Sequence, residues 1–191
     1  MGWRAADRQH VGNLAMQHVN SVITQNAYVV RDIEQSMRTW IDVMGVGPFF
    51  LLPHIQLTDV DYRGTPIDLD ITAAVAFAGP VQIELIEQHN SGPSAYRDVV
   101  PEGEEGFHHV CIYPDDYDAV LADYVGKGMP VATQGTVASS GLRFCYIDAR
   151  PKLNCMMELV DAPDGSGLWA PLREATDNWD GETDPIRLME L

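Results

Sequence analysis

The apolar positions along the chain form two kinds of pattern, short continuous runs typical of strands and a helical spacing. Residues 22–30 form a β-branched apolar run that predicts a strand. From Ile33 to Met44 apolar positions recur at helical spacing, and Asp32 stands just before them as a candidate N-cap. The next segments are an apolar run at 48–55, a polar loop at 59–70 and strands at 71–78 and 81–87. The first part of the chain therefore predicts a strand, a helix and three strands.

The same order of elements then repeats. The second set comprises a strand at 107–113, a helix at 115–125 and strands at 131–137, 142–148 and 154–160. Gln25 precedes Asp32 by seven positions, and His109 precedes Asp116 by the same seven. Internal repeats of this kind are the sequence signature of duplicated structural units. We therefore expect an α+β fold of two tandem βαβββ modules.

The duplication predicts five segments. They are an N-terminal arm (1–20), a first module (21–90), a linker with a short helix (91–106), a second module (107–161) and a C-terminal tail (162–191). The tail is rich in Asp, Gly and Pro and carries Trp169 and Trp179. Two interpretations of the tail are open: an arm packed on the body or on a partner subunit, and a lid over a cleft.

Composition and charge narrow the classes of partner. With 28 acidic and 12 basic side chains in 191 residues, the formal net charge is −16. This balance excludes nucleic acid and anionic membrane surfaces as expected partners, because both are bound through Lys and Arg. No apolar stretch approaches the roughly 20 residues that span a bilayer. Three cysteines without a Cys-x-x-Cys pair indicate buried thiols in a reducing compartment, so we expect a cytoplasmic protein.

Four polar residues occupy equivalent positions in the two repeats. Gln25 and His109 lie in the first strand of each module, and Glu84 and Glu158 lie between apolar neighbours in the last strands. Each residue alone suits a structural role. Two carboxylates inside one sheet would be costly to bury without a partner and would repel each other in a shared cavity. A divalent cation removes both problems, so the joint register predicts a shared metal site.

These segments resemble the vicinal oxygen chelate superfamily, which includes glyoxalase I, methylmalonyl-CoA epimerase, extradiol dioxygenases and bleomycin-resistance proteins. The resemblance covers roughly residues 22–161. It is carried by the segments Gln25–Asp32, Val81–Ile86, Gly106–Val110 and Met157–Val160. It implies a cupped mixed β-sheet that holds one metal through Gln25, Glu84, His109 and Glu158. Of the adjacent histidines, only His109 keeps the seven-residue register.

One imidazole and three oxygen donors form a mostly hard site, for which Zn, Ni, Co, Mn and Mg are all credible. Iron-dependent oxygen chemistry usually uses two histidines and a carboxylate, and Gln25 in the first strand counts against it. Redox-neutral chemistry fits better: a lyase or isomerase that moves a proton next to a carbonyl, with Glu158 or Glu84 as the catalytic base. The alternatives are a ligand-sequestering binding protein and a ring-cleaving dioxygenase.

The substrate stays open between two relatives. The ligand quartet is one that glyoxalase I enzymes use, but Asp42 stands where their pattern has a glutathione-binding Arg. The stretch 83–116 looks more like methylmalonyl-CoA epimerase relatives. An epimerase needs a second acid or base, for which Asp68 and Asp70 are candidates. We expect a small molecule with a carbonyl or vicinal oxygens.

Four further side chains are candidates for substrate contacts. Arg63 lies in a predicted loop, Tyr96 and Arg97 lie in the linker helix, and Arg143 lies at the start of a strand. Each has a structural interpretation beside the functional one. The family resemblance also implies a homodimer.

Overall fold

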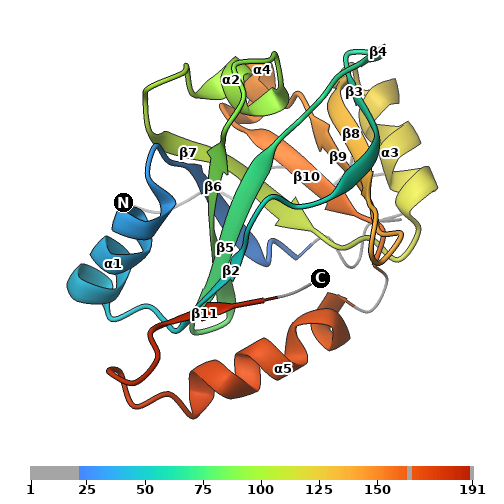
Figure 1. The fold of residues 1–191 in the computed structure, drawn as a ribbon. Helices are drawn as coiled ribbons and strands as arrows, with labels where there is room; N and C mark the ends of the chain where they lie inside the picture. The colour runs from blue at the N-terminus through green and yellow to red at the C-terminus, as the bar shows by residue number, and fades with distance from the viewer. Residues whose placement is uncertain (1–21, 163–164, 190–191) are drawn as a thin grey trace, which may run out of the picture.

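A single mixed β-sheet of eleven strands forms the body of the protein (Figure 1). The computed structural model describes residues 22–162 and 165–189. The helices are α1 (Ile33–Met44), α2 (Ala95–Val99), α3 (Tyr117–Gly126), α4 (Arg150–Leu153) and α5 (Gly165–Asp177). The strands are β1 (Gln25–Val29), β2 (Phe49–Leu52), β3 (Leu57–Tyr62), β4 (Thr65–Pro66), β5 (Ile71–Ala78), β6 (Val81–Gln88), β7 (Gly106–Ile112), β8 (Val131–Val137), β9 (Arg143–Ile147), β10 (Met156–Val160) and β11 (Ile186–Leu188).

The strand order shows the duplication directly. It runs β11-β2-β5-β6-β1-β7-β10-β9-β8-β3-β4. In each half the first strand pairs in parallel with the last, β1 with β6 and β7 with β10. The two halves join where β1 runs antiparallel to β7. The predicted α+β, glyoxalase-like fold is therefore confirmed, and the four strands that carry the predicted ligands lie side by side at its centre.

The two repeated helices cover the outer face of the sheet. Ile33 and Met37 of α1 pack on Ala74 of β5, while Val120 of α3 packs on Leu159 of β10. Side chains alternate along a strand, so the neighbouring positions of β5 turn to the other face. That inner face holds a second apolar cluster around Ile71 and Tyr146. The sheet thus separates a helix-covered outer layer from an inner concave surface.

Both predicted N-caps are present. The Asp32 side chain accepts a hydrogen bond from the backbone N–H of Gln35, and the Asp116 side chain accepts one from Ala119. Such caps satisfy donors that the first turn of a helix leaves free. The seven-residue register between first strand and helix therefore has the same local basis in both halves.

The predicted polar loop at 59–70 is wrong in part, because β3 and β4 occupy half of it. β3 pairs antiparallel with β8, which belongs to the other half of the chain. Its burial alternates poorly, with Thr58 and Asp59 exposed and Val60 buried. A strand that is stabilised mainly by backbone pairing with its neighbours, here β8 and β4, lacks the apolar periodicity that sequence reasoning uses.

The C-terminal tail contributes regular structure. Its helix α5 packs on β5, and β11 pairs in parallel with β2 at the edge of the sheet (Figure 1). Leu172 of α5 belongs to an apolar cluster with Phe50, Leu52 and Phe77. The predicted N-terminal arm lies outside the described residues. None of the helices in the described part of the chain is long and apolar enough to cross a bilayer.

Candidate metal centre and cavity

The structure brings the four predicted ligands together around one nitrogen atom. His109 Nε2 lies 3.3 Å from Gln25 Oε1, 3.5 Å from Glu84 Oε2 and 3.2 Å from Glu158 Oε2. The side chain of His109 is completely buried, and those of Glu84 and Glu158 are 16% and 11% exposed. The cluster occupies the four central strands, β6, β1, β7 and β10, and each module contributes two of its members.

The tautomer of His109 follows from its neighbour His108. Burial, and next the adjacent His109, lower the pKa of His108 well below its usual value, so this ring is neutral. His108 Nε2–H donates to the carbonyl oxygen of Ala95 at 2.9 Å, so its Nδ1 carries a lone pair. That nitrogen lies 2.8 Å from His109 Nδ1, which must therefore be the donor. In the neutral form of His109, the Nε2 lone pair points at the three oxygens.

Two adjacent histidines reach the same region because the strand pairing is irregular there. The register between β1 and β7 shifts between Ala27 and Tyr28, opposite His109 and Phe107 respectively. A bulge of this kind re-aims side chains that would otherwise point to opposite faces. The rings of His108 and His109 lie 5.0 Å apart at 89°. Sequence register alone selected His109 and left His108 without a role.

The amide of Gln25 is oriented by a neighbouring amide. Gln25 Nε2 donates to Gln82 Oε1 at 2.6 Å, which turns the Gln25 oxygen toward His109. Both glutamines are buried. Gln82 is one of the residues that sequence reasoning missed, and its position two residues before Glu84 in an apolar strand was the available signal.

This arrangement fits a divalent cation. Three oxygen acceptors and one nitrogen lone pair face one another, and Glu84 Oε2 is buried without any hydrogen-bond partner. Burial and the nearby Glu158 raise the pKa of Glu84 well above its usual value, as expected for a carboxylate that lacks a compensating charge. Ligand atoms of Glu84, His109 and Glu158 lie within 4.8 Å of one another. Gln25, Glu84, His109 and Glu158 could therefore hold the metal.

A cavity of about 170 Å³ opens over this cluster. Its walls are mainly aliphatic, and no Lys or Arg occurs among the described residues that line it. An engineered apolar cavity of about 150 Å³ holds benzene, so this volume suits a compact group about the size of a six-membered ring. The lining residues besides Gln25, Glu84 and Glu158 are Leu52, Ile55, Leu57, Ile71, Ala73, Val75, Ile86, Tyr96, Tyr113, Val137, Ser140, Leu142, Phe144, Tyr146, Val160, Trp169 and Met189.

Three tyrosines are among the residues that line the cavity. The hydroxyls of Tyr96 and Tyr146 lie 2.9 Å apart, and Trp169 Nε1 donates to the Tyr113 hydroxyl at 2.7 Å. Burial raises the pKa of each of these tyrosines, so they keep their protons and can donate hydrogen bonds. The sequence predicted Tyr96 as a substrate contact but missed the other two. Tyr113 directly follows β7 and continues the alternation of His109, and Tyr146 lies opposite Glu158 in the sheet.

The remaining predicted substrate contacts lie elsewhere. Arg63 pairs with Asp98 and Asp148, and Arg143 pairs with Asp118 and Asp161. Arg97 donates to the carbonyl oxygen of Gln88. Asp70 pairs with His54, and exposed Asp68 accepts a hydrogen bond from Asn90 at its backbone carbonyl. Of the weaker candidates Asp68, Asp70, Arg63, Tyr96, Arg97 and Arg143, Tyr96 alone is among the described residues lining the cavity.

Comparison with known proteins identifies the superfamily of this chain. Residues 24–146 match the family model described as the Glyoxalase/Bleomycin resistance protein/Dioxygenase superfamily. The chain belongs to this superfamily. Among curated proteins it is similar to a 2-epi-5-epi-valiolone epimerase from an Actinomyces species, with 30% identity over 179 residues that cover 87% of each chain.

Solved structures agree on the fold. A hypothetical protein from Bacillus halodurans is 16% identical, with a TM-score of 0.53 over 73% of this chain and 93% of that one. Methylmalonyl-CoA epimerase from Mycobacterium tuberculosis is 13% identical, with a TM-score of 0.50 over 83% of this chain and 97% of that one. At such identities the likeness shows the fold alone. The predicted family resemblance is confirmed.

Proposed function

We propose that this protein is a metal-dependent isomerase or lyase that moves a proton on a carbon next to a carbonyl group, with epimerisation as the first activity to test. The observation that carries the proposal is the convergence of four metal-ligand atoms at the edge of an apolar cavity. The similarity to an epimerase over 87% of the chain supports the same reaction class.

Each group in the cavity has a role in this proposal. A divalent cation held by Gln25, Glu84, His109 and Glu158 would polarise the substrate carbonyl and so acidify the neighbouring C–H bond. Glu84 and Glu158 are the acid–base groups. They come from equivalent strands of the two modules and so can reach a substrate from two sides, as an epimerase requires to take a proton from one face and return it to the other.

The other cavity residues bind and shield the substrate. The Tyr113 hydroxyl accepts from Trp169, which leaves its own proton to donate to a substrate oxygen. The aliphatic walls exclude water, and this strengthens electrostatic interactions at the reacting atoms. The substrate should therefore carry its oxygens at the end that faces the carboxylates, with a compact body of about one ring inside the cavity.

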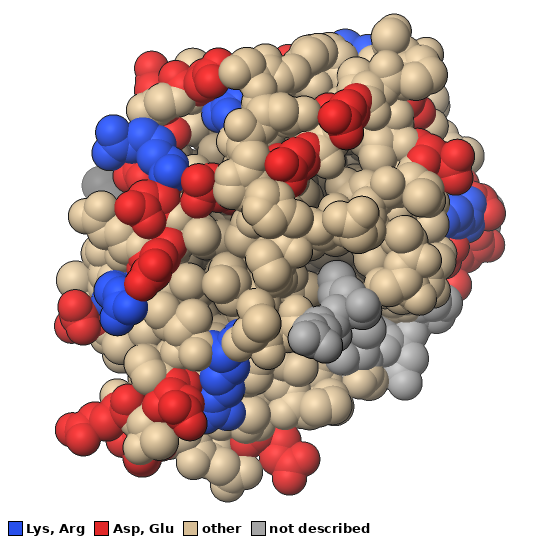
Figure 2. Space-filling model, in the orientation of Figure 1, with Lys and Arg blue, Asp and Glu red and all other residues tan. Residues whose placement is uncertain are grey.

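A large anionic substrate fits this site poorly. The cavity lining described above contains no cationic side chain, and Arg63 and Arg143 are both engaged by two aspartates. Figure 2 shows more acidic than basic side chains on the face turned to the viewer. Coenzyme A esters carry several phosphate charges that would find little compensation here. A small neutral ketone is the better candidate.

The metal site is tested by elemental analysis of the purified protein beside the H109A and E158A variants. We expect a divalent metal in the wild-type protein and a large loss from both variants. A third variant, E104Q, removes an exposed carboxylate in the linker, outside the four proposed ligands, and serves as the matched control. Equal metal content in all four proteins would contradict the site.

The reaction is tested by exchange in deuterated water. Candidate substrates are 2-epi-5-epi-valiolone, methylglyoxal–thiol adducts and acyl-CoA esters. We expect metal-dependent uptake of deuterium beside the carbonyl of the small ketone, and loss of this uptake in E158A. Binding without exchange would favour the sequestering alternative, and oxygen consumption would favour ring cleavage; either result would overturn the proposal.

A further inference from the structure

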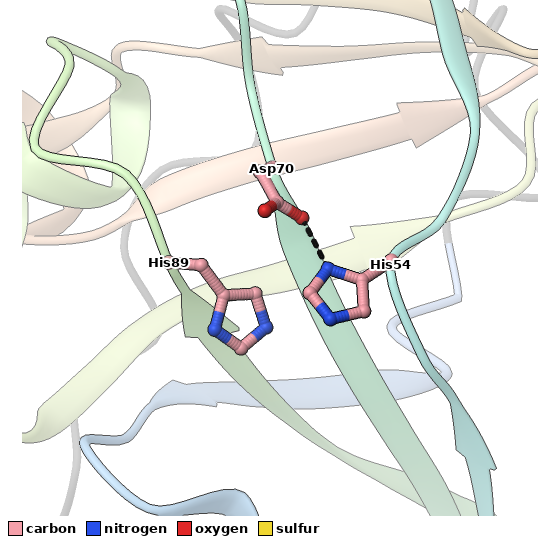
Figure 3. A group of neighbouring side chains, drawn as sticks. All are labelled: His54, Asp70 and His89. Carbon is pink, nitrogen blue, oxygen red and sulfur yellow. Dashed lines mark hydrogen bonds and ion pairs between the residues drawn. The ribbon is translucent and has the colours of Figure 1, made fainter.

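A second group of metal-binding side chains lies at one end of β2, β5 and β6 (Figure 3). His54 lies in the turn after β2, Asp70 directly precedes β5 and His89 directly follows β6. Each offers one donor atom, and the three atoms lie within 4.8 Å of one another. His54 Nδ1 is 2.7 Å from Asp70 Oδ1, and the two imidazole rings are 4.6 Å apart.

The strand backbone holds these residues in place. His54 N–H donates to Thr72 Oγ1 at 3.2 Å, and His89 N–H donates to the carbonyl oxygen of Asp70 at 2.9 Å. Thr72 Oγ1 also lies 2.7 Å from His89 Nε2, which orients that ring. The side chains of His54, Asp70 and His89 are 62%, 41% and 27% exposed. Thr72 of β5 and the Asp70 backbone therefore hold the two histidines in place, while all three side chains remain accessible to solvent.

This cluster is separate from the cavity. Ile71 and Ala73 line the cavity from β5, while Asp70 and Thr72 alternate with them and turn to the opposite face of the sheet. The cavity lining includes none of His54, Asp70 and His89. The cluster thus shares no residue with the candidate metal centre of the proposed function.

We propose that His54, Asp70 and His89 form a second metal site, for Zn²⁺ or a similar transition ion. Two imidazole nitrogens and one carboxylate oxygen leave the fourth position of a tetrahedral site to water. Imidazole donors favour zinc, nickel and copper over magnesium and calcium. The exposed His54 ring can turn so that a cation replaces its hydrogen bond to Asp70, with metal–ligand distances of about 2.0–2.2 Å.

The position of the site indicates what the ion would do. His54 and Asp70 mark the two ends of the segment that contains β3 and β4, and β3 reaches across to pair with β8. Ile55 and Leu57, within three residues of His54, line the cavity. A cation at this site would tie the two ends of the segment to β6, and so stabilise one wall of the cavity without contacting the substrate.

The experiment uses the full chain without an affinity tag, stripped of metal with a chelator and dialysed against Zn²⁺. Bound zinc is measured by elemental analysis, and unfolding temperature by circular dichroism. We expect H54A/H89A to bind one zinc equivalent fewer than the wild-type protein. Zinc should also raise the unfolding temperature of H109A/E158A, and this rise should disappear when H54A/H89A is added. The variant E104Q removes an exposed carboxylate of the linker and should bind as much zinc as the wild-type protein.

The outcomes separate this site from the metal centre at the cavity. If the cavity site fails, H109A/E158A binds as much zinc as the wild-type protein, while H54A/H89A still loses one equivalent. The second site is overturned if H54A/H89A folds and binds as much zinc as the wild-type protein. Deuterium exchange in H54A/H89A should persist, because its residues lie outside the cavity.

Discussion

At the scale of single residues, the neighbours of His109 decide what its free nitrogen can do. His108 accepts a hydrogen bond from His109 Nδ1, and Gln82 fixes the amide of Gln25. Neither His108 nor Gln82 is one of the four proposed ligands. Hydrogen bonds behind a metal ligand set its tautomer and orientation, and their loss commonly lowers metal affinity. The four donor atoms are therefore only part of the site.

We predict that H108F lowers the affinity for a divalent metal about 10- to 100-fold, because Phe can neither accept from His109 nor donate to the Ala95 carbonyl. Gln carries both an acceptor and a donor, so H108Q should retain more affinity. Competition dialysis with a chelator measures the difference. Equal affinities of H108F, H108Q and the wild-type protein would contradict a positioning role for His108.

Glu84 Oε2 has no hydrogen-bond partner, so we predict that E84Q affects thermal stability in opposite directions without and with metal. In metal-free protein, E84Q removes a carboxyl group whose ionisation is opposed by burial and by Glu158, so the unfolding temperature should rise. With metal present, the wild-type protein should gain stability by binding, and E84Q should gain much less. Thermal unfolding with and without a chelator measures both effects.

The exposed acid Glu104 supplies the control, since E104Q makes the same chemical change away from the cluster. Its unfolding temperature should change little and should respond to metal as the wild-type protein does. Destabilisation of metal-free E84Q would show that the Glu84 carboxylate has a partner other than a cation.

At the scale of elements, a charged network holds the linker helix α2 against the second module. Asp98 of α2 pairs with Arg63 from the β3–β4 turn, and Asp148 pairs with Arg63 and with Arg150 of α4. The hydrogen bond from Arg150, and next that from Arg63, hold the pKa of Asp148 far below its usual value of 3.8. Arg63, considered as a substrate contact, is thus engaged in joining three elements.

We predict that D148N lowers the free energy of unfolding by about 2 kcal/mol at pH 7, because two guanidinium groups lose a partly buried charged acceptor. A depressed pKa in the folded state contributes stability above the usual pKa and loses it as pH falls. The difference between D148N and wild-type protein should therefore shrink as pH falls below about 4. Urea unfolding at several pH values measures it, and a difference that stays constant down to pH 2 would contradict the explanation.

The tail is a second element-scale case. Leu172 of α5 is buried against Phe50 and Phe77, whereas Leu188 of β11 is 66% exposed. We predict that L172A costs about 2–3 kcal/mol of unfolding free energy by leaving a cavity, while L188A changes it by less than about 0.5 kcal/mol. Chemical denaturation compares the two variants. Equal effects would show that α5 does not anchor the tail through this cluster.

At the scale of the whole molecule, the net charge of −16 destabilises the folded state, because the acidic side chains repel one another. Exposed ion pairs such as Arg38–Glu34 and Lys127–Asp123 contribute little individually. We predict that raising NaCl from about 20 to 300 mM increases the unfolding temperature, because salt screens the repulsion among the acidic side chains. A lower unfolding temperature at high salt would mean that ion pairs outweigh repulsion. The homodimer stays a prediction, which sedimentation at several concentrations would test.

The repeated elements and the four polar residues of the candidate metal centre could be predicted from the order of the amino acids. Their signals are local: apolar spacing, N-caps and a fixed register, each set within a few residues of the chain. For this reason Asp32 and Asp116, and the strands that carry Gln25 and His109, could be placed without coordinates.

Features that depend on pairing between distant segments could be recognised only in the folded protein. β3 is a strand because it forms backbone hydrogen bonds with β8, and the tail contributes to the cavity wall because its Trp169 lines the cavity. The tautomer of His109 depends on a bulge that brings His108 beside it, and the cluster of His54 with His89 depends on three strands ending together. Contacts of this kind leave no periodic pattern in the sequence, because they depend on which strand ends the sheet brings together.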